Sequence, residues 1–204
     1  MNQLDILILV IYTITVILVL KKAIASVDQV TTIDIDTSDM QAMLEENDLA
    51  DKLKVGFALP NRTPLGKQPT TITVVIANQL DRAVFVDWDR STFNDTKGRS
   101  RRVIRLSPYR GAETISSQVF SPIPPGQTLQ EKITAEDTLV RDGDSIKAQK
   151  PLVAIKKLDV NESITFSLWL VIRLAETDTK DDRIHILPSE FKVTRCPWTD
   201  SLPF

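Results

Sequence analysis

Residues 163–175 read SITFSLWLVIRLA and give the strongest strand signal in the chain. β-Branched and aromatic residues are frequent in this run, and its second half is apolar at nearly every position. A strand that is apolar on both faces is typical of the centre of a sheet. The run therefore predicts a sheet built around a central strand at 163–175.

Further strand-like runs lie on both sides of this segment at short intervals. Residues 70–78 read TTITVVIAN and alternate Thr with larger apolar side chains. The other runs are 54–59, 83–88, 101–106, 114–120, 127–135, 152–158, 183–187 and 190–194. Turn residues such as the PIPPG of 122–126 separate them, and no βαβ alternation appears. We therefore expect an all-β domain, an antiparallel immunoglobulin-like β-sandwich of about 7–9 strands, with a small barrel as the alternative.

The chain opens on a stretch with no charged residue between Asp5 and Lys21. Residues 6–20 read ILILVIYTITVILVL, and twelve of these fifteen are Ile, Leu or Val. A helix over residues 1–20 is about 30 Å long, the thickness of a hydrocarbon core. We therefore predict an N-terminal transmembrane helix in a single-pass protein. Its anchor residues are Ile6, Leu7, Ile8, Leu9, Val10, Ile11, Ile14, Val16, Ile17, Leu18, Val19 and Leu20.

Two questions about this segment stay open in the sequence. A cleaved signal peptide has a basic beginning, which residues 1–5 lack, but Ala23-Ile24-Ala25 is similar to a cleavage site. The side of the membrane is also open. Lys21 and Lys22 follow the apolar run and no basic residue precedes it, which favours a cytoplasmic domain, with an extracytoplasmic one as the alternative.

The expected domain organisation has four parts. Residues 1–22 are the anchor, 23–53 a linker with a short helix, 54–196 the β-sandwich and 197–204 an extended tail. The short helix is predicted to begin at Thr37 or Ser38, which are good N-cap residues. Its apolar positions have helical spacing, at Met40, Met43, Leu44 and Leu49.

Composition excludes several classes of protein. The 204 residues carry a formal net charge of -2, so the chain as a whole is not expected to bind nucleic acid. One cysteine, Cys196, rules out an intrachain disulfide. Charged residues make up 25% and hydrophobic residues 42%, which is typical of a globular domain.

No catalytic, cofactor or metal site is predicted. His185 is the only histidine, and it alternates with Ile184 and Ile186, so we expect it on the solvent face of a strand. One His and one Cys cannot make a closed zinc site. The Asp-Gly-Asp-Ser of 142–145 lacks the further carboxylates of a calcium loop and is interpreted as a polar turn. No small-molecule substrate is identified.

Trp88 is interpreted as a core residue, flanked by Asp87 and Asp89 that face outward. The segment 77–91 (ANQLDRAVFVDWDRS), followed by the Ile-Pro-Pro-Gly of 123–126, resembles uncharacterised bacterial membrane-anchored domains with an immunoglobulin-like or fibronectin-like fold. The resemblance covers about fifty residues and implies a β-sandwich. It implies no catalytic residue and no activity.

A basic run gives the clearest functional hypothesis. Residues 90–110 contain seven cations and a single carboxylate, Asp95. Such a run is either a solvated hairpin balanced by acids elsewhere or a contact for anionic lipid or an acidic partner. The candidate contact residues are Arg90, Lys97, Arg99, Arg101, Arg102, Arg105 and Arg110.

These features predict a protein that is not an enzyme. We expect a membrane-anchored β-sandwich that acts as a protein-binding or assembly scaffold, with the lipid bilayer and another membrane-associated protein as partners. One alternative is an extracytoplasmic envelope domain that binds surface ligands. The other is an enzyme whose site has no sequence signature, which a deep pocket with clustered carboxylates would support.

Overall fold

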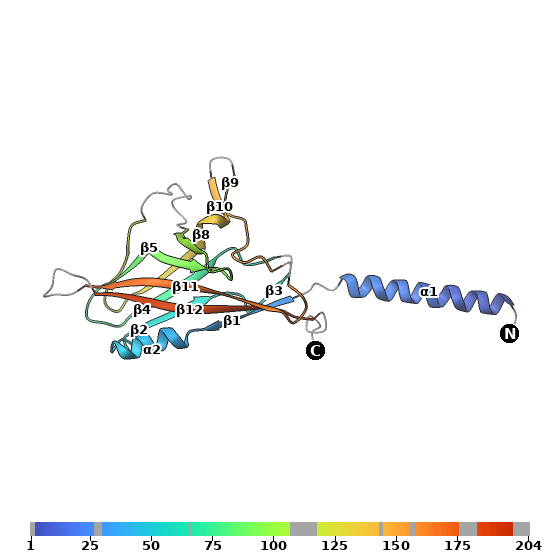
Figure 1. The fold of residues 1–204 in the computed structure, drawn as a ribbon, viewed down its shortest axis with the longest axis horizontal. Helices are drawn as coiled ribbons and strands as arrows, with labels where there is room; N and C mark the ends of the chain where they lie inside the picture. The colour runs from blue at the N-terminus through green and yellow to red at the C-terminus, as the bar shows by residue number, and fades with distance from the viewer. Residues whose placement is uncertain are drawn as a thin grey trace.

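The computed structural model describes residues 3–26, 30–65, 67–106, 118–142, 145–155, 158–175 and 183–197 (Figure 1). The helices in this part of the chain are α1 (Gln3–Ser26), α2 (Ser38–Glu46) and the short 3-10 helix η1 (Glu136–Thr138). The strands are β1 (Val30–Asp36), β2 (Leu53–Ala58), β3 (Arg62–Pro64), β4 (Ile72–Asn78), β5 (Val84–Asn94), β6 (Ser100–Arg105), β7 (Ser121–Ile123), β8 (Thr128–Ala135), β9 (Leu139–Asp142), β10 (Ser145–Ala148), β11 (Ser163–Leu174) and β12 (Arg183–Arg195).

Ten of these strands form one antiparallel sheet that curls around the core. Its order is β2-β4-β8-β6-β5-β11-β12-β1-β3, and β7 pairs with β5 outside this path. β6 joins the two halves, because its first half pairs with β5 and its second half with β8. The curl brings β2, at one end of the sheet, close to β12 in the other half: the ring of Phe57 in β2 lies 5.3 Å from the ring of Phe191 in β12. β9 and β10 form a separate hairpin (Figure 1).

The core lies inside this curl. Phe166 and Phe191 stack at 4.9 Å, and Trp88 and Phe93 are completely buried. The α2 helix packs against β12 and buries Met40 and Leu44 in the same core. The predicted short helix and the all-β character of the domain are thus confirmed.

β12 differs from the prediction because it runs unbroken through Pro188. Residues 183–187 and 190–194 were predicted as two strands, since proline has no N–H to donate to a sheet. The N–H of Cys196 faces β1 and donates to the carbonyl of Val30, so the even-numbered positions of β12 face the β1 side. β1 ends at Asp36, opposite Glu190, so no β1 residue lies beside Pro188. The missing N–H of Pro188 therefore costs no hydrogen bond between strands.

Two other regions also differ from the prediction, and two further ones lie mostly outside the described residues. Val30–Asp36, expected within the 23–53 linker, forms β1 and pairs with β12, so these residues belong to the sheet. Residues 152–158, expected as a strand, contain no strand among the described positions. Most of the predicted strand at 114–120 lies outside the described residues, as does most of the 197–204 tail; β7 forms just after the former, at Ser121–Ile123.

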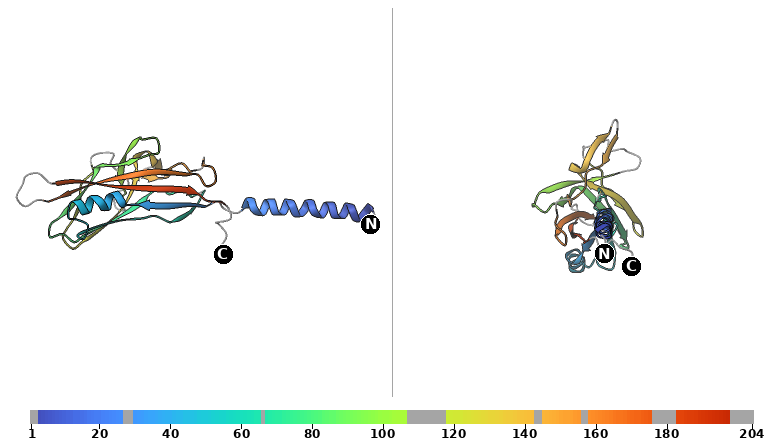
Figure 2. Two further views of the ribbon diagram at one scale, coloured as in Figure 1. Left: turned by 60° about the horizontal axis from the view of Figure 1, so that its bottom comes forward. Right: turned by 90° about the vertical axis from the view of Figure 1, so that its right-hand side faces the viewer.

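α1 projects from the end of the domain, and its described side chains are all exposed (Figure 2). They include thirteen large apolar side chains between Ile6 and Leu20. Within the described residues, no helix has the length and apolar character needed to cross a membrane. The segment predicted as an anchor at 1–22 is observed as the helix α1.

Candidate functional site: the arginine hairpin

The basic run forms the β5–β6 hairpin, and Asp95 organises its turn. The Asp95 carboxylate accepts hydrogen bonds from the backbone N–H of Lys97 and of Arg99, both at 2.9 Å, and from Arg99 Nε at 2.8 Å. Gly98 has φ +72°, a conformation that glycine adopts without strain. Burial opposes ionisation of Asp95, but the hydrogen bonds from Arg99 and Lys97 together hold its pKa below the usual value.

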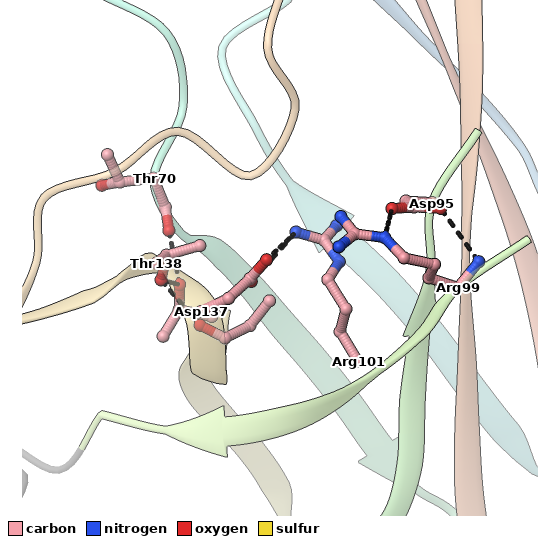
Figure 3. A network of polar contacts seen from close by, with 8 residues as sticks. Thr70, Asp95, Arg99, Arg101, Asp137 and Thr138 are labelled. Atoms are coloured by element: carbon pink, nitrogen blue, oxygen red, sulfur yellow. Dashed lines mark hydrogen bonds and ion pairs between the residues drawn. The ribbon is translucent and has the colours of Figure 1, made fainter. Parts of the chain in front are cut away.

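Arg101 lies beneath this turn and connects the hairpin to η1 (Figure 3). Its side chain is only 10% exposed, and Nη1 donates to Asp137 at 3.1 Å. Next to Asp137, the Thr138 hydroxyl donates to the carbonyl of Ala135, and Thr134 donates to the carbonyl of Thr70. Nε and Nη2 of Arg101 are buried without a hydrogen-bond partner among the described residues. Arg101 therefore connects parts of the fold and is not a surface cation.

Arg102 and Arg105 are bound to acidic side chains of neighbouring strands. Arg102 Nη2 lies 2.6 Å from Asp89, which also accepts a hydrogen bond from the backbone N–H of Gln118. Arg105 Nη1 lies 3.6 Å from Glu131 and donates to the Ser121 hydroxyl at 2.7 Å. Both arginine side chains are 26% exposed, so most of their surface is unavailable to a partner.

A bulge in β5 lies next to the charged residues Asp87 and Arg173, which are on the outer face of the sheet. The pairing of β5 with β11 is irregular between Trp169 and Val171, opposite residues 88–91. Trp88 turns inward and donates from Nε1 to the Ser121 hydroxyl at 2.9 Å, as a core tryptophan needs. Asp87 lies beside Val171 but is only 2% exposed, because Arg173 covers it with an ion pair of 2.6 Å. The core position predicted for Trp88 is confirmed, while Asp87 is buried rather than solvated.

The seven predicted contact residues therefore do not form one basic face. Arg90 and Arg99 are 60% and 68% exposed, and Lys97 is also exposed. Arg101, Arg102 and Arg105 are mostly buried and have carboxylate partners, and Arg110 lies outside the described residues. The partners are distant in sequence, so the run alone gave no sign of them. The exposed members of the run are therefore Arg90 and the two residues of the hairpin tip, Lys97 and Arg99.

The tip lies at the end of the sheet from which α1 departs. β5 ends at Asn94, beside Ser167 near the start of β11, and β12 ends at Arg195, beside Thr31. Lys67 lies at the same end, because it follows Pro64, the residue paired with Val30. Both Lys67 and Lys97 are exposed. The exposed Lys67 and Lys97 thus lie toward the end of the domain that joins α1, where the exposed Asp159 and Glu162 also lie.

His185 corrects a sequence-based prediction. It was expected on the solvent face, but Ile184 and Ile186 are exposed and His185 is half-buried opposite the buried Ile172. Burial lowers its pKa, and the nearby charge of Arg183 lowers it further. Cys196 is 8% exposed and lies eleven residues away along one extended strand, about 36 Å. The two side chains cannot form a catalytic dyad.

The described residues hold no group of three or more His, Cys, Asp or Glu side chains arranged to bind a metal ion. One hollow of about 370 Å³ lies beside β1 and is lined by Thr32, Ile33, Asp34, Ile35, Asn61 and Arg62. It contains one carboxylate, that of Asp34, whereas a two-carboxylate hydrolytic site needs a pair. The hollow beside α2, about 330 Å³, is lined by Met40, Leu44, Glu45 and Lys54 among others.

The exposure of Trp169 was not predicted from the sequence. Residues 163–175 were expected to be covered on both faces, yet Trp169 is 47% exposed on the outer face. Trp169 alternates with the buried Leu168 and Leu170, and this spacing is the signal for an outward position. Because all three residues are apolar, the sequence alone does not show which of them face outward.

Comparisons with known proteins add little to this description. No protein-family model matches the chain, and no curated protein matches it. One solved structure that matches is titled "X-ray structure of Northeast Structural Genomics Consortium target SoR45". It is 12% identical, covers 81% of this chain and 88% of its own, and has a TM-score of 0.29. A similarity at this level supports no argument about fold or function.

Proposed function

We propose that this protein is a non-enzymatic binding or assembly module that α1 attaches to a membrane. The observation that carries the proposal is the surface of α1. Thirteen large apolar side chains between Ile6 and Leu20 are 37–67% exposed, and they lie on all sides of the helix. A helix that is hydrophobic all round requires an apolar environment on every side.

The free energy involved is large. Complete burial of one large aliphatic side chain stabilises by about 1.5–3 kcal/mol, so thirteen side chains that are roughly half exposed leave on the order of 10 kcal/mol unrealised in water. Lipid can supply this, since a helix satisfies its own backbone hydrogen bonds there. Lys21 and Lys22 at one end and Asp5 at the other would lie among the headgroups.

The hairpin tip supports contact with anionic lipid. With α1 in a bilayer, the end of the domain that carries Lys67, Lys97 and Arg99 would face the membrane surface. Each cation near an anionic leaflet contributes about 1 kcal/mol. The resemblance of residues 77–91 to bacterial membrane-anchored immunoglobulin-like domains agrees with this arrangement, and the sandwich class and the cytoplasmic side remain part of the proposal.

Flotation of the full-length protein with phosphatidylcholine vesicles tests the attachment. We expect the protein to float with the vesicles and to stay bound in 1 M salt, where the Debye length is about 3 Å and surface electrostatics are screened. Changing Ile11 and Val16 to Lys should release it, because each cation at the helix centre costs about 2.5–3.5 kcal/mol. Lys52→Glu, at the far end of the domain, is the matched charge-changing control. An unmodified protein that stays at the bottom of the gradient would refute the proposal.

A further inference from the structure

The outer face of β11 and β12 carries an apolar surface that no other element covers among the described residues. Trp169, Ile184 and Ile186 are 47%, 46% and 49% exposed. Cross-strand pairing brings them together, because Trp169 lies opposite Pro188 and Val171 opposite Ile186. We call Trp169, Ile184, Ile186 and the partly exposed Pro188 the outer-face patch. Exposed large apolar side chains that gather in this way mark interaction surfaces.

Cations border the patch on its β5 side. Arg173, the cross-strand neighbour of Ile184, lies 2.6 Å from Asp87 and 4.5 Å from the ring centre of Phe120. Arg90 Nε lies 3.8 Å from the same Asp87 carboxylate and is 60% exposed. Two guanidinium groups share one carboxylate, so this border has a net positive charge.

Acidic residues border the patch on the opposite side, where β12 is flanked first by β1 and then by α2 (Figure 2). Asp36 and Glu190 are exposed cross-strand neighbours. Backbone and hydroxyl hydrogen bonds from Ser38 hold the pKa of Asp36 below its usual value, so it is charged at neutral pH.

We propose that the outer-face patch is the interface of a homodimer whose two-fold axis runs along the strands of β11 and β12. Such an axis places the cationic border of each copy opposite the acidic border of the other, as a self-complementary isologous contact requires. A partner of one charge sign would match only one of the two borders. Aligned face-to-face packing is a common arrangement of sheets, and the centre contains Trp and Ile with an Arg at its edge, residues frequent in interfaces.

The proposal concerns the sheet face alone and does not depend on where α1 lies. The same axis leaves both α1 helices at one end of the dimer, because α1 precedes β1 in the chain and lies at the end of the domain where β1 begins (Figure 1). A protein that floats with vesicles but never dimerises would refute the dimer and leave the membrane attachment intact.

Cysteine crosslinking of the full-length protein in detergent micelles tests the geometry. The background variant is Cys196→Ser, which removes the native thiol. Ile186→Cys lies near the proposed axis and should form a disulfide-linked dimer on mild oxidation. Val160→Cys, equally exposed at 47% but at the α1 end of the domain, is the matched control and should remain monomeric. Equal crosslinking of the two variants, or none from Ile186→Cys, would overturn the proposal.

A charge exchange tests the borders, with the molar mass measured by light scattering in the same micelles. Arg90→Glu alone, or Glu190→Lys alone, should each weaken the dimer by at least about tenfold in Kd, or ~1.4 kcal/mol. The combined variant should recover most of that loss, because opposite charges again face each other. Circular dichroism melts show whether each variant is folded. The interface is contradicted if the combined variant loses as much dimer affinity as the separate changes added together. It is also contradicted if the unmodified protein is monomeric at every concentration.

Discussion

The two α-helices in the described part of the chain, α1 and α2, meet their surroundings in opposite ways. α2 has one apolar side, which buries Met40 and Leu44 in the core, and a wet side that carries Glu45 and Glu46. α1 has apolar side chains on every side, and all of its described side chains are exposed. α2 is therefore explained by the fold of its own chain, whereas α1 is explained only by surroundings that the chain does not supply.

This difference separates two kinds of stability. The apolar side chains of α2 contribute to the free energy of unfolding of the β domain, because unfolding exposes them to water. In the proposed membrane attachment, those of α1 contribute instead to partition between water and lipid. Variants in the two helices should therefore change two different measurements.

The largest effect is expected for Leu44→Ala in α2. Leu44 is 4% exposed in the core, and removal of its side chain leaves a cavity that costs about 2–5 kcal/mol in the free energy of unfolding. Leu9→Ala in α1, where Leu9 is 58% exposed, should change that free energy by less than about 0.5 kcal/mol. Urea unfolding followed by near-ultraviolet circular dichroism measures both. Equal destabilisation by the two variants would show that α1 packs on the domain.

A smaller effect is expected for Lys97→Glu, which tests whether the hairpin tip contacts the membrane to which α1 is proposed to attach. Reversal of one exposed charge near an anionic surface should weaken binding to phosphatidylserine vesicles by about 1–2 kcal/mol and leave binding to phosphatidylcholine unchanged. Lys52→Glu, before β2 at the α2 end of the domain, is the matched reversal and should have no effect. The measurement is vesicle titration at low salt. Identical behaviour of the two variants would remove the hairpin tip from the membrane contact.

The smallest effect is expected from His185 on β12, the strand against which α2 packs. Burial lowers the pKa of His185 below its ordinary 6.5, so the unfolded chain binds a proton that the folded protein does not. Stability should therefore fall as the pH drops from 7 through 6.5 and below. His185→Gln should remove this slope between pH 7 and 5. Asp36 and Asp95, whose pKa values lie below 3.8, titrate outside this window. A slope that persists in His185→Gln would assign it to another group.

Much of the fold follows from local sequence patterns. The alternation in residues 70–78 predicts β4, and the spacing of Met40, Met43 and Leu44 predicts α2, because both patterns place apolar side chains on one face. β1 has a weaker pattern, a β-like alternation that includes Ile33 and Ile35 within a polar stretch, and this stretch was predicted as a linker. Its buried Thr31 is polar and is satisfied by the hydroxyl of Thr63, a residue 32 positions away. Local sequence gives no sign of this partner.

The candidate site was less predictable than the fold. The basic run indicates charge but not its partners: Arg101 binds Asp137, 36 residues away, and Asp87 binds Arg173, 86 residues away. Only tertiary structure separates these internal pairs from the exposed Lys97 and Arg99. The position of His185 was predicted wrongly for a related reason, since either face of β12 could have been the buried one.

The most direct measurement of the central claim is the environment of α1 itself. A spin label at Thr13→Cys, in the Cys196→Ser background, reports whether oxygen, which concentrates in lipid, or a water-soluble nickel complex reaches the middle of the helix. In full-length protein bound to vesicles, we predict strong relaxation by oxygen and little by the nickel complex. Relaxation by the nickel complex equal to that of a label at Val160→Cys would mean that water surrounds α1, and would contradict membrane attachment.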